Sequence, residues 1–281
     1  MSQTALREVA ADGPLLVFGG PYSNLQATRA MLDEAARRGM PPGRVICTGD
    51  VVAYGADAAA CCDLIMASGI WVIAGNCEEN LAEGALDCGC GFEEGTACDL
   101  LSRAWYAHAN QQVTGAHRAW MAGLPQRLMV RLPDGRRLAV LHGGASDISR
   151  FIFASTPPAE LAAEIAATGC DGVIAGHCGI PFVRQVGPGV WINAGAIGMP
   201  ADDGTPRIWF AVLTPGEAGL SVEILPLEYD HAAAAAAMRM AGLPEGYAAA
   251  LGSGIWPSCD VLPPAERARR GEKLMPVGLV W

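Results

Sequence analysis

The chain has 281 residues, of which 51% are hydrophobic and 17% are charged. This composition is typical of a folded globular protein and excludes a disordered chain, which has few hydrophobic residues and many charges. The 29 acidic and 19 basic residues give a formal net charge of −10. This charge argues against binding to a nucleic acid duplex, because such binding depends on clustered Lys and Arg.

The sequence contains no run of about 18 apolar residues, so we expect no membrane-spanning segment and no membrane partner. Glu8 and Asp12 precede a very short apolar run near the N-terminus, which is unlike a signal peptide. We therefore expect a cytoplasmic protein. Thiols stay reduced in that compartment. We therefore expect the ten cysteines to be core residues, metal ligands or redox groups in preference to disulfide partners.

Short apolar runs alternate with amphipathic stretches in the first half of the chain, a pattern typical of an α/β fold. Strands are expected at 15–18, 45–48 and 70–74, and helices at 25–38, with Asn24 as the N-cap, and at 57–68. Each of these strands ends in a loop of Gly and polar residues. Ligands bind at such loops in open α/β sheets.

The middle of the chain contains a glycine- and cysteine-rich loop, DCGCGFEEGT, at 87–96. The turn at 133–135 predicts a hairpin of strands 128–132 and 138–141. Helices are expected at 97–112 and 158–167, and further strands at 172–175, 182–186, 190–193, 208–213 and 220–225. The spacing of the last four strands favours antiparallel pairing. These elements predict two mixed sheets packed face to face, with helices outside.

The chain changes character at residue 229. Asp230 can cap an Ala-rich helix that extends to about residue 240, and a second short helix is expected at 244–251. We therefore expect one domain over residues 1–228 and a helical C-terminal extension over residues 229–281, packed on the same domain.

Four strand-end loops carry a side chain that can bind a metal ion. These residues are Asp50 in GDVVAYG, Asn76 in GNCEEN, His142 in LHGG and His177 in GHCG. A Gly beside each permits close approach of the backbone at a crowded centre. Two imidazoles with a carboxylate and an amide oxygen suit Mn, Fe or Zn, so we expect one or two ions of this kind.

The order of these motifs resembles that of the calcineurin-like metallophosphoesterase superfamily, from about residue 15 to residue 213. FGGPYSNLQA is similar to the family motif Asp-x-His-(Gly/Ser)-Asn-Leu-x-Ala, and GHCGIPF is similar to Gly-His-Thr-His-x-Pro-Phe. The tail LEYDHAAAAAAMRMAGLP resembles the ending of a small bacterial branch that includes phosphodiesterases and diadenosine-tetraphosphatase-like proteins. The resemblance implies a four-layer αββα sandwich of two mixed β-sheets flanked by helices.

In that family two metal ions share a bridging Asp, and metal-bound hydroxide attacks the phosphorus of a phosphate ester. The resemblance makes Asp50 the bridge and adds three ligands of the second site, Asn76, His142 and His177. Cys77 stands where the family has a His that assists the leaving group. The resemblance thus predicts a phosphodiesterase or phosphatase for a small phosphorylated substrate, with catalytic residues Asp50, Asn76, Cys77 and His142.

The first metal site of the family departs from this pattern. It needs an Asp and two His, and those positions hold Gly20, Tyr22 and Gly179. One metal ion in the matched site can be enough for hydrolysis. Alternatively, thiols rebuild the missing site, the candidates being Cys77, Cys88, Cys90, Cys98 and Cys178. A third explanation is a non-catalytic metal- or thiol-dependent binding or sensor protein on a phosphoesterase scaffold.

Three further residues are candidates for contact with the substrate. The phenol of Tyr22 can hydrogen-bond a phosphate from the position of a lost ligand, and Asn24 belongs to the same motif. Arg150 follows the loop of His142 and can bind a phosphate with two parallel hydrogen bonds. The sequence leaves the substrate and the oligomeric state open, a homo-oligomer included.

Overall fold

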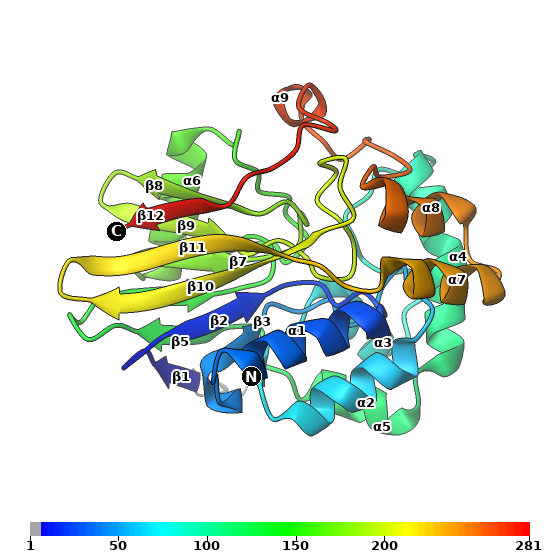
Figure 1. Ribbon diagram of the computed structural model, residues 1–281, viewed down its shortest axis with the longest axis horizontal. Coiled ribbons are helices and arrows are strands. Elements are labelled where there is room, and N and C mark those ends of the chain that lie inside the picture. The colour runs from blue at the N-terminus through cyan, green and yellow to red at the C-terminus, as the bar shows by residue number, and fades with distance from the viewer. Residues whose placement is uncertain (1–6) are drawn as a thin grey trace.

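The computed structural model describes residues 7–281. Two six-stranded sheets pack face to face, and helices cover their outer faces (Figure 1). This arrangement is the four-layer αββα sandwich that the sequence predicts.

Each sheet combines parallel and antiparallel strand pairs. The first sheet contains, in spatial order, β1 (Arg7–Ala10), β5 (Leu128–Arg131), β6 (Arg137–Val140), β7 (Gly172–Ala175), β9 (Gly189–Asn193) and β8 (Phe182–Val186). The second sheet contains β12 (Val277–Val280), β11 (Gly219–Leu227), β10 (Ile208–Gly216), β2 (Leu15–Phe18), β3 (Val45–Cys47) and β4 (Trp71–Val72). The expected hairpin forms between β5 and β6. Antiparallel pairing is confirmed for β8 with β9 and β10 with β11, whereas β9 also pairs in parallel with β7.

The helices of the described residues follow the expected order, with some additions. They are α1 (Leu25–Arg37), α2 (Ala58–Ser68), α3 (Asn76–Glu83), α4 (Ala97–Gln112), α5 (Gly115–Ala122), α6 (Pro158–Thr168), α7 (His231–Met240), α8 (Glu245–Ser253) and α9 (Pro264–Arg267), with a 3-10 turn at Pro42–Arg44. Helix α3 was not expected. It begins at Asn76, one of the predicted metal ligands, so this side chain is fixed by a helix start and not by a loop alone.

The core explains why the sandwich has four layers. In β2, Leu15 and Val17 point into the apolar layer between the two sheets, and Leu16 and Phe18 point to the layer beneath α1. Alternate side chains of a strand point to opposite faces, so a strand that is apolar throughout must be covered on both sides. A third apolar layer lies between the first sheet and α6, where Trp191 packs with Leu161.

The C-terminal extension is not wholly helical, which corrects the expectation from the sequence. After α7, α8 and α9 the chain returns as β12, which pairs antiparallel with β11. Trp281 anchors this return, because its Nε1–H donates to the carbonyl oxygen of Pro188 at 2.8 Å and the guanidinium of Arg136 lies 4.1 Å from its ring. Residues 277–280 are rich in Val and suit a sheet edge, a signal that the sequence analysis overlooked.

No helix within residues 7–281 is both long enough and apolar enough to cross a lipid bilayer.

Candidate metal centre

Loops from both sheets meet at one end of the sandwich. Asp50 follows β3 and Asn76 follows β4, both in the second sheet. His142 follows β6 and His177 follows β7, both in the first sheet. The carboxyl ends of these strands therefore bring the four predicted ligands to one place.

The imidazole of His142 lies at the centre of this group. Its Nε2 is 3.0 Å from Nδ1 of His177, 3.1 Å from Oδ1 of Asn76 and 3.3 Å from Oδ2 of Asp50. Ligand atoms of the carboxylate and the two imidazoles all lie within 4.8 Å of one another. All four side chains are buried. We call Asp50, Asn76, His142 and His177 the metal-ligand cluster.

The hydrogen bond on the other ring nitrogen fixes the tautomer of His142. Nδ1 lies 2.6 Å from the carbonyl oxygen of Thr48, and a carbonyl oxygen can only accept, so Nδ1 carries the hydrogen. In the neutral imidazole Nε2 then presents a lone pair to the oxygens of Asp50 and Asn76, which are also acceptors. A cation would satisfy this set of buried acceptors, and an imidazole fixed by a backbone carbonyl is the usual arrangement of a metal ligand.

The electrostatics of the cluster favour a cation at this place. Burial alone would lower the pKa of His142, but the Asp50 carboxylate attracts a proton and raises that pKa above its usual value. Burial and then the neighbouring His142 lower the pKa of His177 to about 3. A proton and a metal ion thus compete for the same atoms of the cluster.

Two of the predicted ligand residues have an unusual backbone. Asp50 has φ +55 and His177 has φ +61, both in the left-handed region. This conformation is uncommon for residues other than Gly and costs about 1–3 kcal/mol, and it is concentrated at functional sites. The surrounding contacts must therefore hold these residues in place.

Glu78 provides such contacts and was missed by the sequence analysis. Its fully buried carboxylate accepts the backbone N–H of Asp50 at 2.7 Å and that of Gly75 at 2.9 Å through Oε2. Its Oε1 accepts the N–H of Val52 at 3.3 Å. Burial and then the negative charge of Asp50 raise the pKa of Glu78 to about 7. The available signal was a Glu three residues after Gly75, the position from which a carboxylate can accept the backbone N–H of the N-cap residue.

Residues 22–217 match the sequence profile of the calcineurin-like phosphoesterase superfamily domain. The chain belongs to the calcineurin-like phosphoesterase superfamily. This confirms the resemblance carried by the strand-end motifs and makes the protein a metal-dependent hydrolase of phosphate esters.

Solved structures agree with the fold of this phosphoesterase. The metallophosphoesterase from Sphaerobacter thermophilus is 24% identical, covers 86% of this chain and 99% of its own, and superposes with a TM-score of 0.66. The hypothetical protein PH1004 from Pyrococcus horikoshii OT3 is 17% identical, with the same two coverages and a TM-score of 0.71. No curated protein sequence matches the chain significantly.

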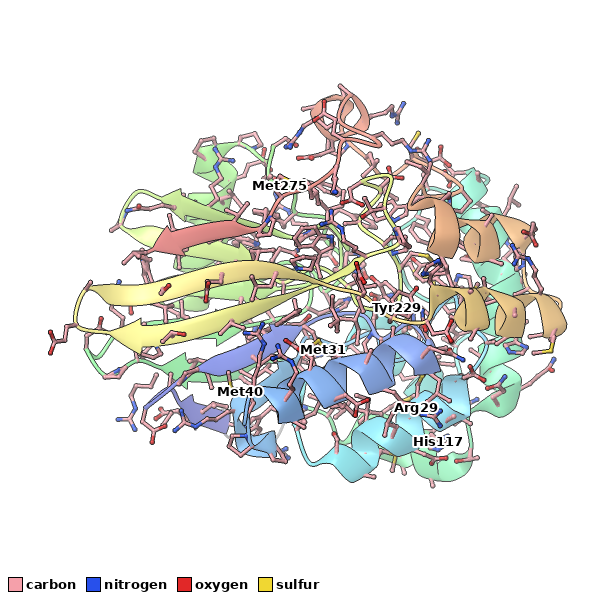
Figure 2. The ribbon with its side chains drawn as sticks, viewed as in Figure 1. Arg29, Met31, Met40, His117, Tyr229 and Met275 are labelled. Atoms are coloured by element: carbon pink, nitrogen blue, oxygen red, sulfur yellow. A yellow bond between two sulfur atoms is a disulfide. The ribbon has the colours of Figure 1, made fainter. Side chains whose placement is uncertain are left out.

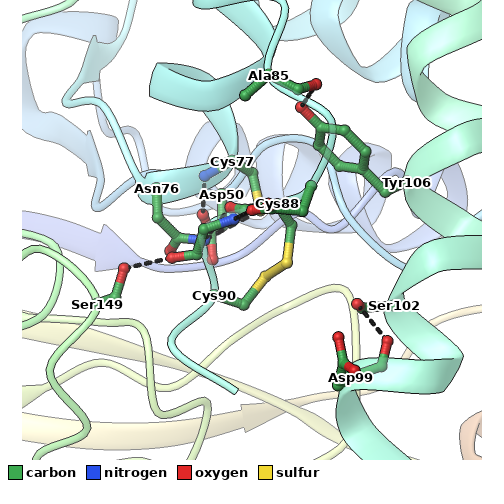
Figure 3. The surroundings of a disulfide bond; sticks show 12 residues. Asp50, Asn76, Cys77, Ala85, Cys88, Cys90, Asp99, Ser102, Tyr106 and Ser149 are labelled. Carbon is green, nitrogen blue, oxygen red and sulfur yellow. Dashed lines mark hydrogen bonds between the residues drawn. A yellow bond between two sulfur atoms is a disulfide. The ribbon is translucent and has the colours of Figure 1, made fainter. Parts of the chain in front are cut away.

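Two cysteines of the phosphoesterase differ from expectation, because Cys88 and Cys90 form a disulfide with each other (Figure 3). This pairing corrects the expectation that both are reduced thiols available to a metal ion. The backbone of Gly89 turns with φ +60 between them and brings their Cα atoms to 5.3 Å. The same loop supports the cluster, because Nδ2 of Asn76 donates to the carbonyl oxygen of Cys88 at 2.9 Å.

The other candidate thiols remain free and do not join the group of Asp50 and the two histidines within residues 7–281. Cys77 is buried beside Asn76, and burial followed by the charge of Asp50 raises the pKa of its thiol well above the usual value. Cys178 donates from Sγ to the carbonyl oxygen of Ile180 and accepts from Asn193. Cys98 is partly exposed on α4. Burial also raises the pKa of the Cys178 thiol, to about 12.

The three predicted substrate contacts have different outcomes. Tyr22 is buried near the cluster, with its ring against Gly20. Asn24 instead caps α1 and donates both amide hydrogens within the protein, to the carbonyl oxygen of Gly198 and to the hydroxyl of Tyr229. Figure 2 shows Tyr229 near the first turn of α1.

Arg150 also makes contacts within the protein. Its guanidinium pairs with the carboxylates of Glu160 and Glu164 on α6. The side chains of Arg150 and Asn24 are thus both engaged in contacts within the protein.

Proposed function

We propose that this phosphoesterase hydrolyses a small phosphate monoester or diester with one transition metal ion, held by Asp50, Asn76, His142 and His177. The observation that carries the proposal is the convergence of their acceptor atoms around Nε2 of His142, at 3.0 to 3.3 Å. These nitrogen and oxygen donors suit Mn, Fe or Zn. Such an ion, when bound, supplies a Lewis acid for the phosphate and lowers the pKa of water.

Aromatic side chains support the proposal of one ion. A Cβ at Gly20 would lie 2.4 Å from Cζ of Tyr22, so no longer side chain fits there while this ring is in place. A Cβ at Gly179 would lie 3.4 Å from the ring of Trp256 and 3.8 Å from the hydroxyl of Tyr22. The ring of Tyr22 thus takes the room beside Gly20, one of the positions that the resemblance assigns to a ligand of the first site.

The chain's own residues position the reacting groups. Glu78 holds the backbone of Asp50, the carbonyl of Thr48 orients His142, and the carbonyl of Cys88 turns Oδ1 of Asn76 toward the cluster. Burial, and next the charge of Asp50, raises the pKa of Tyr22 well above its usual value, so its hydroxyl keeps its hydrogen. From its place beside the cluster this hydroxyl can donate a hydrogen bond to a phosphate oxygen.

The test combines elemental analysis of the purified protein with assays on p-nitrophenyl phosphate and bis-p-nitrophenyl phosphate in Mn, Fe or Zn. We expect one metal equivalent per chain and metal-dependent turnover. Asp50→Ala and His142→Ala should lose both, whereas His231→Ala, at the start of α7 and outside the cluster, should keep both.

Other outcomes separate the alternatives. Two ions per chain would contradict the single site. Bound metal without turnover on any ester would favour the non-catalytic binding or sensor protein. A protein that binds no metal and gains no activity from added metal would overturn the proposal.

A further inference from the structure

A pocket lies beside the metal-ligand cluster and shares His177 with it. Aromatic rings form much of its wall, and they belong to Tyr22, Tyr54, Phe92, Phe151, Tyr247 and Trp256. The ring of Phe151 lies 4.4 Å from the imidazole of His177, so the aromatic surface reaches the cluster itself. We call this feature the aromatic pocket.

The rings of the aromatic pocket support one another. Tyr54 packs against Tyr22 and against Tyr247, with ring centres 4.9 Å apart in both pairs. Trp256 is fixed at two points, because its Nε1–H donates to the carbonyl oxygen of Pro200 and its backbone N–H donates to Asp202, each at 2.6 Å. The walls are therefore preorganised, which lowers the entropy lost when a ligand binds.

The C-terminal extension supplies one side of the pocket. Tyr247 lies on α8, and Trp256 follows that helix. The metal ligands, in contrast, come from loops between residues 50 and 177. The extension thus forms part of the binding site of the domain that it covers.

The charges around the pocket restrict what it can hold. Among the described residues that line it there is no Lys or Arg. Arg150 is occupied by Glu160 and Glu164. A second phosphate or a carboxylate in the pocket would lose its water without gaining a basic partner, which costs several kcal/mol. An apolar ring has no such desolvation cost, and it could pack edge-to-face or offset against the aromatic walls.

We propose that the aromatic pocket binds an uncharged aromatic or other apolar substituent of a phosphate ester whose phosphate lies at the metal-ligand cluster. The inference rests on the proposed function and adds a substrate class to it. It excludes polyphosphates and favours a monoester or diester with one neutral, apolar group.

The test measures the affinity of the manganese-loaded protein for phenylphosphonate, methylphosphonate, pyrophosphate and phenol by titration calorimetry. We expect phenylphosphonate to bind roughly tenfold or more tightly than methylphosphonate, because the ring is buried against apolar walls. Equal affinities of the two phosphonates, or tighter binding of pyrophosphate than of phenylphosphonate, would overturn the inference.

The same titrations separate this inference from the proposed function. Binding of phenol with no binding of either phosphonate would contradict the phosphoesterase site and keep the apolar pocket. Binding of none of these compounds would overturn both.

Two variants change the pocket in opposite ways. Trp256→Ala removes a wall, and Cys98→Leu adds bulk beside it, since Cys98 also lines the pocket. Both should reduce the preference for phenylphosphonate to less than about threefold and leave methylphosphonate affinity unchanged. The control is Trp71→Ala on β4, whose ring donates to the carbonyl oxygen of Gly43, and it should keep the full preference. A full preference in both pocket variants would contradict the assignment.

Discussion

The carboxylate of Glu78 accepts the backbone N–H of Asp50 at 2.7 Å and thereby holds a metal-ligand residue whose φ is +55. We expect Glu78→Gln to weaken metal affinity by about 10- to 100-fold, because partners that orient a ligand commonly contribute this much. The measurement is a metal titration against a chelator. Glu79→Gln, on the next residue of α3, should leave the affinity unchanged. An unchanged affinity in Glu78→Gln would contradict the positioning role.

Glu78 also makes stability depend on pH in the metal-free protein. Its pKa is raised to about 7 in the fold from 4.5. The proton on Glu78 therefore stabilises the fold fully below pH 4.5, and this contribution is lost as the pH rises through 7. We expect this contribution to the free energy of unfolding to reach about 3 kcal/mol. Urea unfolding with a chelator should show this decline in the wild type and not in Glu78→Gln, and parallel pH profiles of the two proteins would refute it.

The contact between Gly20 and Tyr22 predicts a specific steric cost. Gly20→Ala should destabilise the fold by more than about 2 kcal/mol, because it adds a clash with the ring to the strain of a positive φ. Gly39→Ala is the control, since it has a positive φ and open space around it. The cost at Gly20 should fall by at least about 1 kcal/mol in a Tyr22→Ala background. Additive effects in thermal unfolding would show that the ring does not fill this space.

The thiols should have no direct part in metal binding. Cys88→Ser combined with Cys90→Ser removes the disulfide, and Cys178→Ser removes a thiol that is already engaged by Ile180 and Asn193. We expect elemental analysis to find one metal equivalent in both variants, as in the wild type. Loss of the metal would instead favour a site rebuilt from cysteines.

Local sequence patterns predicted those strands and helices whose burial pattern and capping depend on residues close together in the chain. The strand at 15–18 is confirmed, as is the N-cap of α1 by Asn24. Helix α3 was missed because its start depends on Glu78 folding back onto Gly75 and on contacts with the loop of Asp50. Such tertiary contacts leave no periodic signal in the sequence.

The sequence predicted which four side chains meet at the candidate site, and less of what surrounds them. Motifs at strand ends could be placed together because parallel strands share an edge. The pairing of Arg150 with Glu160 and Glu164 could not be foreseen, since it depends on how a loop lies against α6. The contribution of Trp256 to the aromatic pocket could not be foreseen either. Trp256 and His177 line the same pocket but lie about 80 residues apart in the chain.

The metal-ligand cluster and part of the aromatic pocket come from different segments of the chain, which matters for engineering. The proposed metal ligands and the residues that hold them lie between residues 48 and 177, whereas Tyr247 and Trp256 enter the pocket from the C-terminal segment. A library of substitutions confined to the extension can therefore search for new ester preferences while the reacting centre keeps its geometry. Ester preference and metal binding can thus be changed by substitutions in different segments of the chain.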